Sequence, residues 1–271
     1  DEGYSINIFN GMGGNDSIWG NEYSVNQVYG GDGNDYLEGG LSNSYNLMYG
    51  EAGNDWLSGG RGSSYNELHG GAGNDQLGCA HGSDNVNHLY GDDGDDFLVG
   101  GSDYNNQNFM YGGDGNDTLA SSTYSDPDSS SYLEGGNGED NYEWAGGNVT
   151  INNFHTDISS DYWDQITFAG GFSADVEYSQ DNADLICTDL QTGQALRIQN
   201  AFMGPNYQQL GFYGEDVEQI TYQFADYVYI TDSNAQFNYS DVYTRTYEFT
   251  SEAYNDTLVD QSFGVSNYLF D

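Results

Sequence analysis

Basic residues are almost missing from this 271-residue chain. It has no lysine and only three arginines, Arg61, Arg197 and Arg245, against 44 acidic residues, for a formal net charge of −41. A chain of this charge repels nucleic acid and anionic membrane surfaces, so both are excluded as partners. No stretch is long and apolar enough to be a transmembrane segment, and no signal peptide opens the sequence.

Cysteine and catalytic signatures are scarce as well. The two cysteines, Cys79 and Cys187, have no zinc-site spacing, and both a pair of buried free thiols and a disulfide remain open. The four histidines form no His-Glu-x-x-His motif, and no Gly-x-Ser-x-Gly turn occurs. The sequence therefore predicts a protein that is not an enzyme.

Glycine, in contrast, is abundant and periodic. A clear copy of the repeated unit runs from Gly30 through Gly31, Gly33 and Asp35 to Leu37, and related units recur about every twenty residues. This pattern resembles the nonapeptide Gly-Gly-x-Gly-x-Asp-x-U-x of the RTX family, also called haemolysin-type calcium-binding repeats. The loops end at Asp16, Asp35, Asp55, Asp75, Asp96, Asp117 and Asp140.

The spacing within each repeat divides it into a fixed and a variable half. An asparagine stands nine residues before each of the first six aspartates, whereas the segment from each aspartate to the next asparagine grows from ten to twelve residues along the chain. A stacked coil tolerates insertion only where nothing is held in register. We therefore expect the metal at the aspartate edge and none at the asparagine edge.

Two apolar columns complete the predicted fold. The residue two after each aspartate is Ile18, Leu37, Leu57, Leu77, Leu98, Leu119 or Tyr142, and the residue two after each asparagine is also apolar. Alternation of this kind predicts short parallel strands of three or four residues in two sheets over a thin core. The predicted fold class is all-β: a parallel β-roll, or β-solenoid, of about seven coils with calcium along one edge, followed by a β-rich capping module.

The resemblance implies a set of calcium ligands. Calcium takes six to eight hard oxygens, and in the family each ion lies between successive loops, which share carbonyl and aspartate ligands. Seven loops would then hold about six Ca²⁺ ions. Met12, Glu51 and Asp92 replace the second glycine in three loops, which places the backbone there in question. The implied metal ligands are Asp16, Gly33, Asp35, Gly53, Asp55, Gly73, Asp75, Gly94, Asp96, Gly115, Asp117, Gly138 and Asp140.

The main alternative is that these aspartates are ordinary solvated turn residues. Stacked carboxylates about 4.8 Å apart would repel by about 0.9 kcal/mol per pair in water, and by more at a lower dielectric. This repulsion favours a bound cation. The neutral asparagine column is instead predicted to hydrogen-bond along the stack as a structural ladder.

Composition and motifs divide the chain into three regions. Residues 1–145 are predicted to form the roll, 146–223 the capping module, and 224–271 a β-rich tail of unknown role. Strand-like segments in the second and third regions are 149–154, 163–168, 176–180, 184–188, 195–202, 217–222, 227–230 and 243–249. Because residue 1 lies within a repeat, the chain is expected to be a piece of something longer, and the resemblance implies bacterial type I secretion.

An aromatic column is predicted on the outer surface. Tyr29, Tyr49, Tyr90 and Tyr111 follow the inward residues of the asparagine-side strands, with His69 between them. Cross-strand aromatic pairs stabilise sheets, so the column has a structural explanation. The functional alternative is a contact strip for a glycan or another protein. Ice binding is disfavoured because the column lacks threonine.

These observations leave two classes of function. The first is a secreted calcium-binding structural protein that self-associates into an extracellular fibre, surface layer or adhesin. The second is a calcium-dependent folding and secretion module of a larger exoprotein or enzyme whose catalytic domain lies outside this chain.

Overall fold

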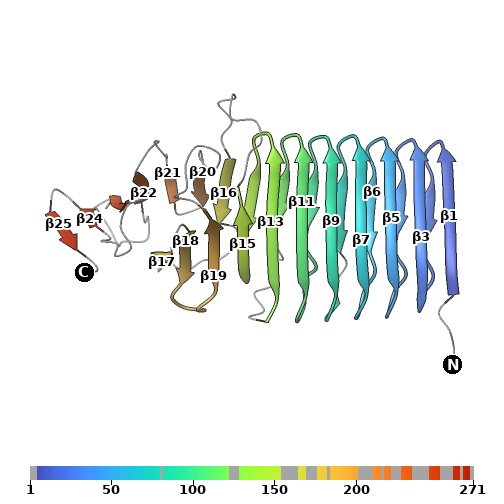
Figure 1. Cartoon of the computed structure of the whole chain (residues 1–271), viewed down its shortest axis with the longest axis horizontal. Coiled ribbons are helices and arrows are strands. Elements are labelled where there is room, and N and C mark those ends of the chain that lie inside the picture. The colour runs from blue at the N-terminus through green and yellow to red at the C-terminus, as the bar shows by residue number, and fades with distance from the viewer. Residues whose placement is uncertain are drawn as a thin grey trace.

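The computed structural model describes residues 5–79, 82–121, 128–153, 164–168, 176–181, 184–200, 210–214, 217–220, 227–233, 244–250, 259–262 and 265–268. These segments contain 25 strands in three sheets and no helix. No helix able to cross a membrane is therefore present in the described segments. Figure 1 shows the strands of successive coils side by side along the long axis of the molecule.

Two sheets run along the roll. The first contains, in spatial order, β1 (Ser5–Gly13), β3 (Ser24–Asp32), β5 (Tyr45–Ala52), β7 (Tyr65–Ala72), β9 (Val86–Asp93), β11 (Gln107–Asp114), β13 (Ser130–Asn137), β15 (Asn148–Asn152), β19 (Ala195–Gln199), β18 (Asp184–Asp189) and β17 (Val176–Asp181). The second contains β2 (Ser17–Trp19), β4 (Tyr36–Glu38), β6 (Trp56–Gly59), β8 (Gln76–Cys79), β10 (Phe97–Val99), β12 (Thr118–Ala120), β14 (Asn141–Trp144), β16 (Asp164–Phe168), β20 (Leu210–Gly214) and β21 (Val217–Ile220).

Each coil contributes one strand to each sheet, and neighbouring coils pair in parallel at the same register. Val28, for example, aligns with Met48, and Leu37 aligns with Leu57. The all-β parallel solenoid of about seven turns is thus confirmed. One detail was wrong: the repeat strands of the first sheet have eight or nine residues, because they continue through the first two glycines of the loop, as in β3.

The core is the pair of apolar columns that the repeat predicts. Leu37, Leu57 and Leu98 are completely buried, as are Val28 and Met48 on the facing strands. Phe9 and Ile18 in the first coil are only partly buried. Because this core is one side chain deep, contacts between coils must supply much of the stability.

The asparagine column closes the opposite edge, and its predicted ladder is confirmed. The side chain of Asn46 donates from Nδ2 to Asn66 Oδ1 at 2.8 Å, and Asn66 donates in the same way to Asn87 at 2.8 Å. Asn46 Oδ1 also accepts the Gly40 N–H at 2.8 Å. These buried amides therefore hold the variable loop while satisfying one another.

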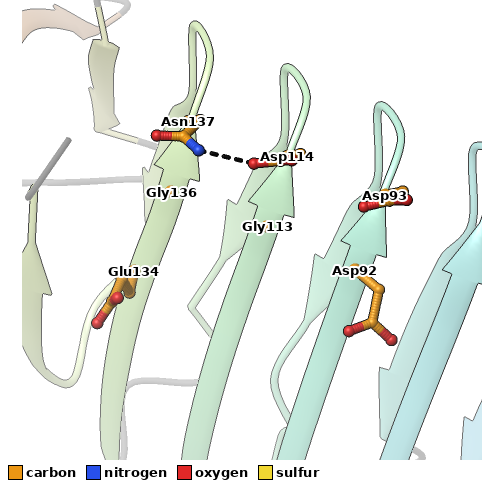
Figure 2. Close-up of a pocket in the computed structure, with 7 residues that line it drawn as sticks. All are labelled: Asp92, Asp93, Gly113, Asp114, Glu134, Gly136 and Asn137. Carbon is orange, nitrogen blue, oxygen red and sulfur yellow. Dashed lines mark hydrogen bonds between the residues drawn. The ribbon is translucent and has the colours of Figure 1, made fainter. Parts of the chain in front are cut away.

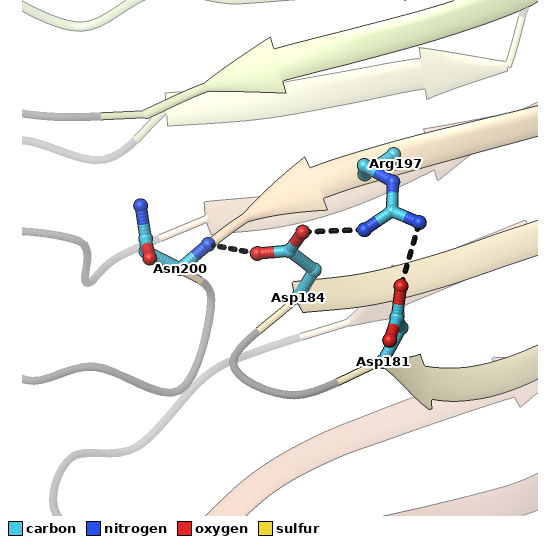
Figure 3. Close-up of polar contacts among 4 residues, drawn as sticks. All are labelled: Asp181, Asp184, Arg197 and Asn200. Carbon is cyan, nitrogen blue, oxygen red and sulfur yellow. Dashed lines mark hydrogen bonds and ion pairs between the residues drawn. The ribbon is translucent and has the colours of Figure 1, made fainter.

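Strand direction changes after the parallel stack. β18 pairs antiparallel with β19 and β17, and β20 pairs antiparallel with β21. Arg197 on β19 donates to Asp184 at 2.5 Å and to Asp181 at 2.8 Å, and Asp184 accepts the Asn200 N–H (Figure 3). This cluster fastens the β17–β18 hairpin to the parallel stack.

The remaining strands form a separate antiparallel sheet of β22 (Tyr227–Ser233), β23 (Thr244–Thr250), β24 (Val259–Ser262) and β25 (Val265–Tyr268). The segments predicted after residue 145 coincide with strands, although positions 154, 163, 201–202, 221–222 and 243 lie outside the described residues. The domain boundaries at 145 and 223 remain predictions. Cys79 and Cys187 are both free thiols, so the disulfide left open by the sequence is not formed.

Candidate metal-binding edge

The aspartate edge consists of tight loops between the long and short strands of each coil. We number the six loop residues 1 to 6, so that in the second coil position 1 is Gly30 and position 6 is Asp35. Position 4 requires a positive φ, which is 134° at Gly33 and 138° at Gly53, where a side chain would be strained. A Cβ at Gly53 would also overlap the Gly33 carbonyl oxygen of the preceding coil. Glycine is thus needed for both the turn and the close stacking.

The three departures from glycine at position 2 keep the turn. Met12, Glu51 and Asp92 have φ values of 74°, 76° and 73°, whereas Gly31 and Gly71 have 108° and 110°. These values are left-handed, a conformation that costs a residue with a side chain about 1–2 kcal/mol. At these three positions, which the sequence placed in question, the backbone therefore keeps the positive φ of the glycine loops, with a smaller value.

The position-6 aspartates form a second ladder, on the edge opposite the asparagines. From Asp35 onward, Oδ1 of each one accepts the backbone N–H of the aspartate one coil earlier: Asp55 N–H donates to Asp75, and Asp75 N–H donates to Asp96, both at 2.7 Å. Asp75 is only 1% exposed. The ladder therefore connects the predicted aspartates in one column, buried from Asp35 onward, which runs through Asp16, Asp35, Asp55, Asp75, Asp96, Asp117 and Asp140.

The second carboxylate oxygen of these aspartates has no hydrogen-bond partner. Oδ2 is buried without a donor in all seven of the residues just named. Leaving a charged oxygen in this state is costly, because it has lost water and gained nothing in return. The ladder is therefore incomplete without a positively charged or proton-bearing group.

Position 1 explains where Oδ2 points. A Cβ placed on Gly70 would overlap Asp75 Oδ2 and would lie 2.6 Å from the Gly91 carbonyl oxygen of the next coil. Two acceptor oxygens from successive coils thus both lie close to the Gly70 Cα. The same pair recurs six times, formed by Asp16 with Gly30, Asp35 with Gly50, Asp55 with Gly70, Asp75 with Gly91, Asp96 with Gly112, and Asp117 with Gly135.

The electrostatics of the ladder agree with this geometry. Burial raises the pKa of Asp75 to about 6, and it raises the pKa values of Asp96 and Asp117 to about 7. The pKa of Asp140 rises to about 8, first because of burial and then because of the neighbouring Asp164. Without a cation, several of these carboxyl groups therefore resist ionisation at neutral pH.

The donor set fits calcium. Every ligand available at this edge is a hard oxygen, from a carboxylate or a backbone carbonyl, as calcium requires. Within the described residues, no group of three or more His, Cys, Asp or Glu side chains converges on one point. Each coil instead contributes one aspartate, and backbone oxygens must complete the shell. The sequence predicted the position-4 glycines as ligands, which stays a prediction; the proximity of the position-1 carbonyls to Oδ2 is visible only in the folded coil.

A shallow acidic depression lies on the outer side of the same loops. It has a volume of about 340 Å³ and is lined by Asp92, Asp93, Gly113, Asp114, Glu134, Gly136 and Asn137. Figure 2 shows these side chains spread over neighbouring strands, with Asn137 Nδ2 donating to Asp114 Oδ1 at 2.7 Å. The depression is separate from the buried ladder, and its carboxylates do not share a focal point.

The tyrosine column lies on the outer face of the first sheet. Tyr29 stacks on Tyr49 with ring centroids 5.2 Å apart, and Tyr90 stacks on Tyr111 at 5.0 Å. His69 fills the middle of the column, 4.9 Å from Tyr49 and 4.5 Å from Tyr90. Because the rings cover one another's faces, the column stabilises the sheet. A glycan or protein partner on it remains a prediction.

Comparison with known families supports the interpretation of the loops. The model of the RTX calcium-binding nonapeptide repeat (4 copies) matches residues 3–22, 29–65, 49–77, 80–106 and 105–123. The matched segments, which lie between residues 3 and 123, therefore carry calcium-binding repeats of the RTX family. No curated protein matches the sequence.

The ladder extends beyond the repeats recognised in the sequence. Asp140 N–H donates to Asp164 Oδ1 at 2.7 Å, so Asp164 is an eighth member of the column. Sequence reasoning overlooked this residue because no glycine loop precedes it. A signal was present, since Ile166 follows Asp164 at the same spacing as Leu37 follows Asp35.

Proposed function

We propose that calcium ions bind between successive loops of the aspartate ladder, about six in all, and that they fold the roll. The observation that carries this proposal is the set of six oxygen pairs, each made of one unpartnered aspartate Oδ2 and the position-1 carbonyl of the next coil. A divalent cation bound by both oxygens of a pair would neutralise the buried charge and join two coils. Position-4 carbonyls, which point along the stack, are the further ligands that the proposal assigns.

The choice of calcium over magnesium follows from the flexibility of the donors. Magnesium demands an octahedral shell at about 2.1 Å, whereas calcium accepts irregular shells of backbone oxygens at about 2.3–2.6 Å. Circular dichroism in excess chelator tests the proposal. β-Sheet signal is expected to disappear in chelator at neutral pH and to return cooperatively with calcium, but not with magnesium at the same concentration. Unchanged spectra in chelator would remove the proposal.

The biological role that we propose is structural and extracellular. Nearly all charged side chains are acidic, and bound extracellular calcium would neutralise only part of the net negative charge, which keeps the folded chain soluble. β1 is an edge strand of the first sheet, and it exposes Ile6 and Ile8 by 72% and 67%. Exposed apolar residues on a sheet edge support self-association into a fibre, surface layer or adhesin.

The alternative is a calcium-dependent folding and secretion module of a larger exoprotein. The family match favours it, because RTX repeats are typical of secreted bacterial proteins and are generally non-catalytic. Light scattering and electron microscopy with and without calcium separate the two roles. Calcium-dependent assembly supports the structural role, whereas a monomer at high concentration in calcium supports the module.

A further inference from the structure

The end of the ladder differs from its interior. Six aspartates face the carbonyl oxygen of a position-1 glycine in the next coil, but the coil after Asp140 has no glycine loop. Its first-sheet strand is β15, in which Ile151 aligns with Leu133. Two residues further on, Asn153 stands at the register position of Gly135. The position-1 place in the eighth coil is therefore held by a residue with an oxygen-bearing side chain.

Asn153 is buried and unpartnered. Val149, Ile151 and Asn153 alternate with more exposed residues and are 2%, 0% and 2% exposed, so all three face the interior. Neither Oδ1 nor Nδ2 of Asn153 has a hydrogen-bond partner. A buried amide in this state is destabilising, because it has lost its hydrogen bonds to water without replacing them. The asparagines of the opposite ladder, in contrast, are fully bonded.

Two ladder aspartates meet at the same place. Oδ2 of Asp140 lies over Gly135, where it has no donor, and Asp140 N–H is bonded to Asp164 Oδ1 at 2.7 Å. Both aspartates are 1% exposed. The Tyr142 side chain also reaches Gly135, since its hydroxyl oxygen accepts the Gly135 N–H at 2.9 Å. The strand register thus places the unpartnered Asn153 amide one coil beyond Gly135, over which Asp140 Oδ2 lies, at the end of the ladder.

We propose that Asp140, Asn153 and Asp164 form a further calcium site beyond the repeats. Asp140 Oδ2 binds the ion as Oδ2 of each earlier ladder aspartate does in the proposed sites. The Asn153 oxygens replace the glycine carbonyl oxygens that this coil lacks. Asp164 supplies a second carboxylate, so that fewer backbone carbonyls are needed. The site rests on the proposed function, because it continues the same column. It brings the expected number of ions from six to seven.

Counting calcium ions on the full chain tests this site. Native mass spectrometry and calorimetric stoichiometry at saturating calcium are expected to give seven ions for the wild type and six for Asp164→Asn. The asparagine keeps Oδ1 as an acceptor for Asp140 N–H, so the ladder hydrogen bond survives. Asn153→Ala provides a second variant, also expected to bind six ions, without altering any ladder aspartate.

Asp103→Asn is the matched control, because it makes the same chemical change in a loop of the asparagine edge. It is expected to bind seven ions. A wild type that binds six ions, with no change in Asp164→Asn, overturns the site and leaves the proposed function intact. Seven ions in both Asp164→Asn and Asn153→Ala also overturn the site. A wild type that binds none overturns the proposed function itself.

Discussion

Replacing Asp75 by asparagine separates the charge of the ladder from its hydrogen bonds. The new side chain retains Oδ1 as an acceptor for the Asp55 N–H, which now lies at 2.7 Å. Its amide nitrogen takes the place of Oδ2 and faces the Gly91 carbonyl, so that two opposed acceptors become a donor and an acceptor. The variant is therefore expected to stabilise the calcium-free roll and to lose calcium at this coil.

The size of the effect follows from the ionisation of Asp75. Burial raises its pKa from 3.8 to about 6, and each unit corresponds to about 1.4 kcal/mol. Ionising this carboxyl group at neutral pH therefore costs at most about 3 kcal/mol. In chelator at pH 7.5, Asp75→Asn should gain up to this amount in free energy of unfolding.

Denaturant titrations of wild type and variant, each with chelator and with calcium, measure both effects. The variant is expected to be more stable than wild type in chelator and less stable in saturating calcium. If the wild type is unfolded in chelator, a stabilising osmolyte common to both samples brings the transition into range. An Asp75→Asn chain that is destabilised in chelator, or that retains every calcium ion, would refute the reasoning.

Three further predictions follow from the same geometry. The pKa values of Asp75, Asp96 and Asp117 are raised in the folded roll, so the protonated carboxyl groups stabilise it fully below about pH 4, and this stabilisation is lost as pH rises through about 6–7. In chelator, β-sheet signal should therefore increase on acidification. Asn66→Ala breaks four buried hydrogen bonds and should cost about 2–4 kcal/mol in denaturant titrations while the ion count stays the same. Gly70→Ala places a methyl group against Asp75 and should cost about 1–3 kcal/mol and one ion, whereas Gly78→Ala, whose Cβ meets nothing within 4 Å, should change neither stability nor ion count. Loss of sheet signal in acid, loss of ions in Asn66→Ala, or equal effects of the two glycine variants would contradict these predictions.

The sequence predicted the periodic parts of the fold well, because the same constraint recurs in every coil. Each Leu37-like residue must face inward, and each Asn46-like residue must bond to the next, so seven repeats report the same geometry. Strand length was harder to predict, because the residues at loop positions 1 and 2, most of them glycines, look like turn residues but extend the strand. The approach of the position-1 carbonyls to Oδ2 could not be predicted, since it depends on how successive coils stack. Asp164 was missed for a related reason, as its ladder contact depends on register and not on glycine.

The placement of the oxygen pairs explains why calcium would act on the whole roll at once. Each pair joins an aspartate of one coil to a carbonyl of the next, so no coil holds a complete site alone. The binding free energy of every ion is therefore free energy of contact between neighbouring coils. In a solenoid whose repeats touch only their neighbours, raising that contact term makes partly stacked states unfavourable. Under the proposed function, the buried carboxylates would oppose stacking below the calcium concentration that fills the ladder, and above it the same groups would hold the coils together.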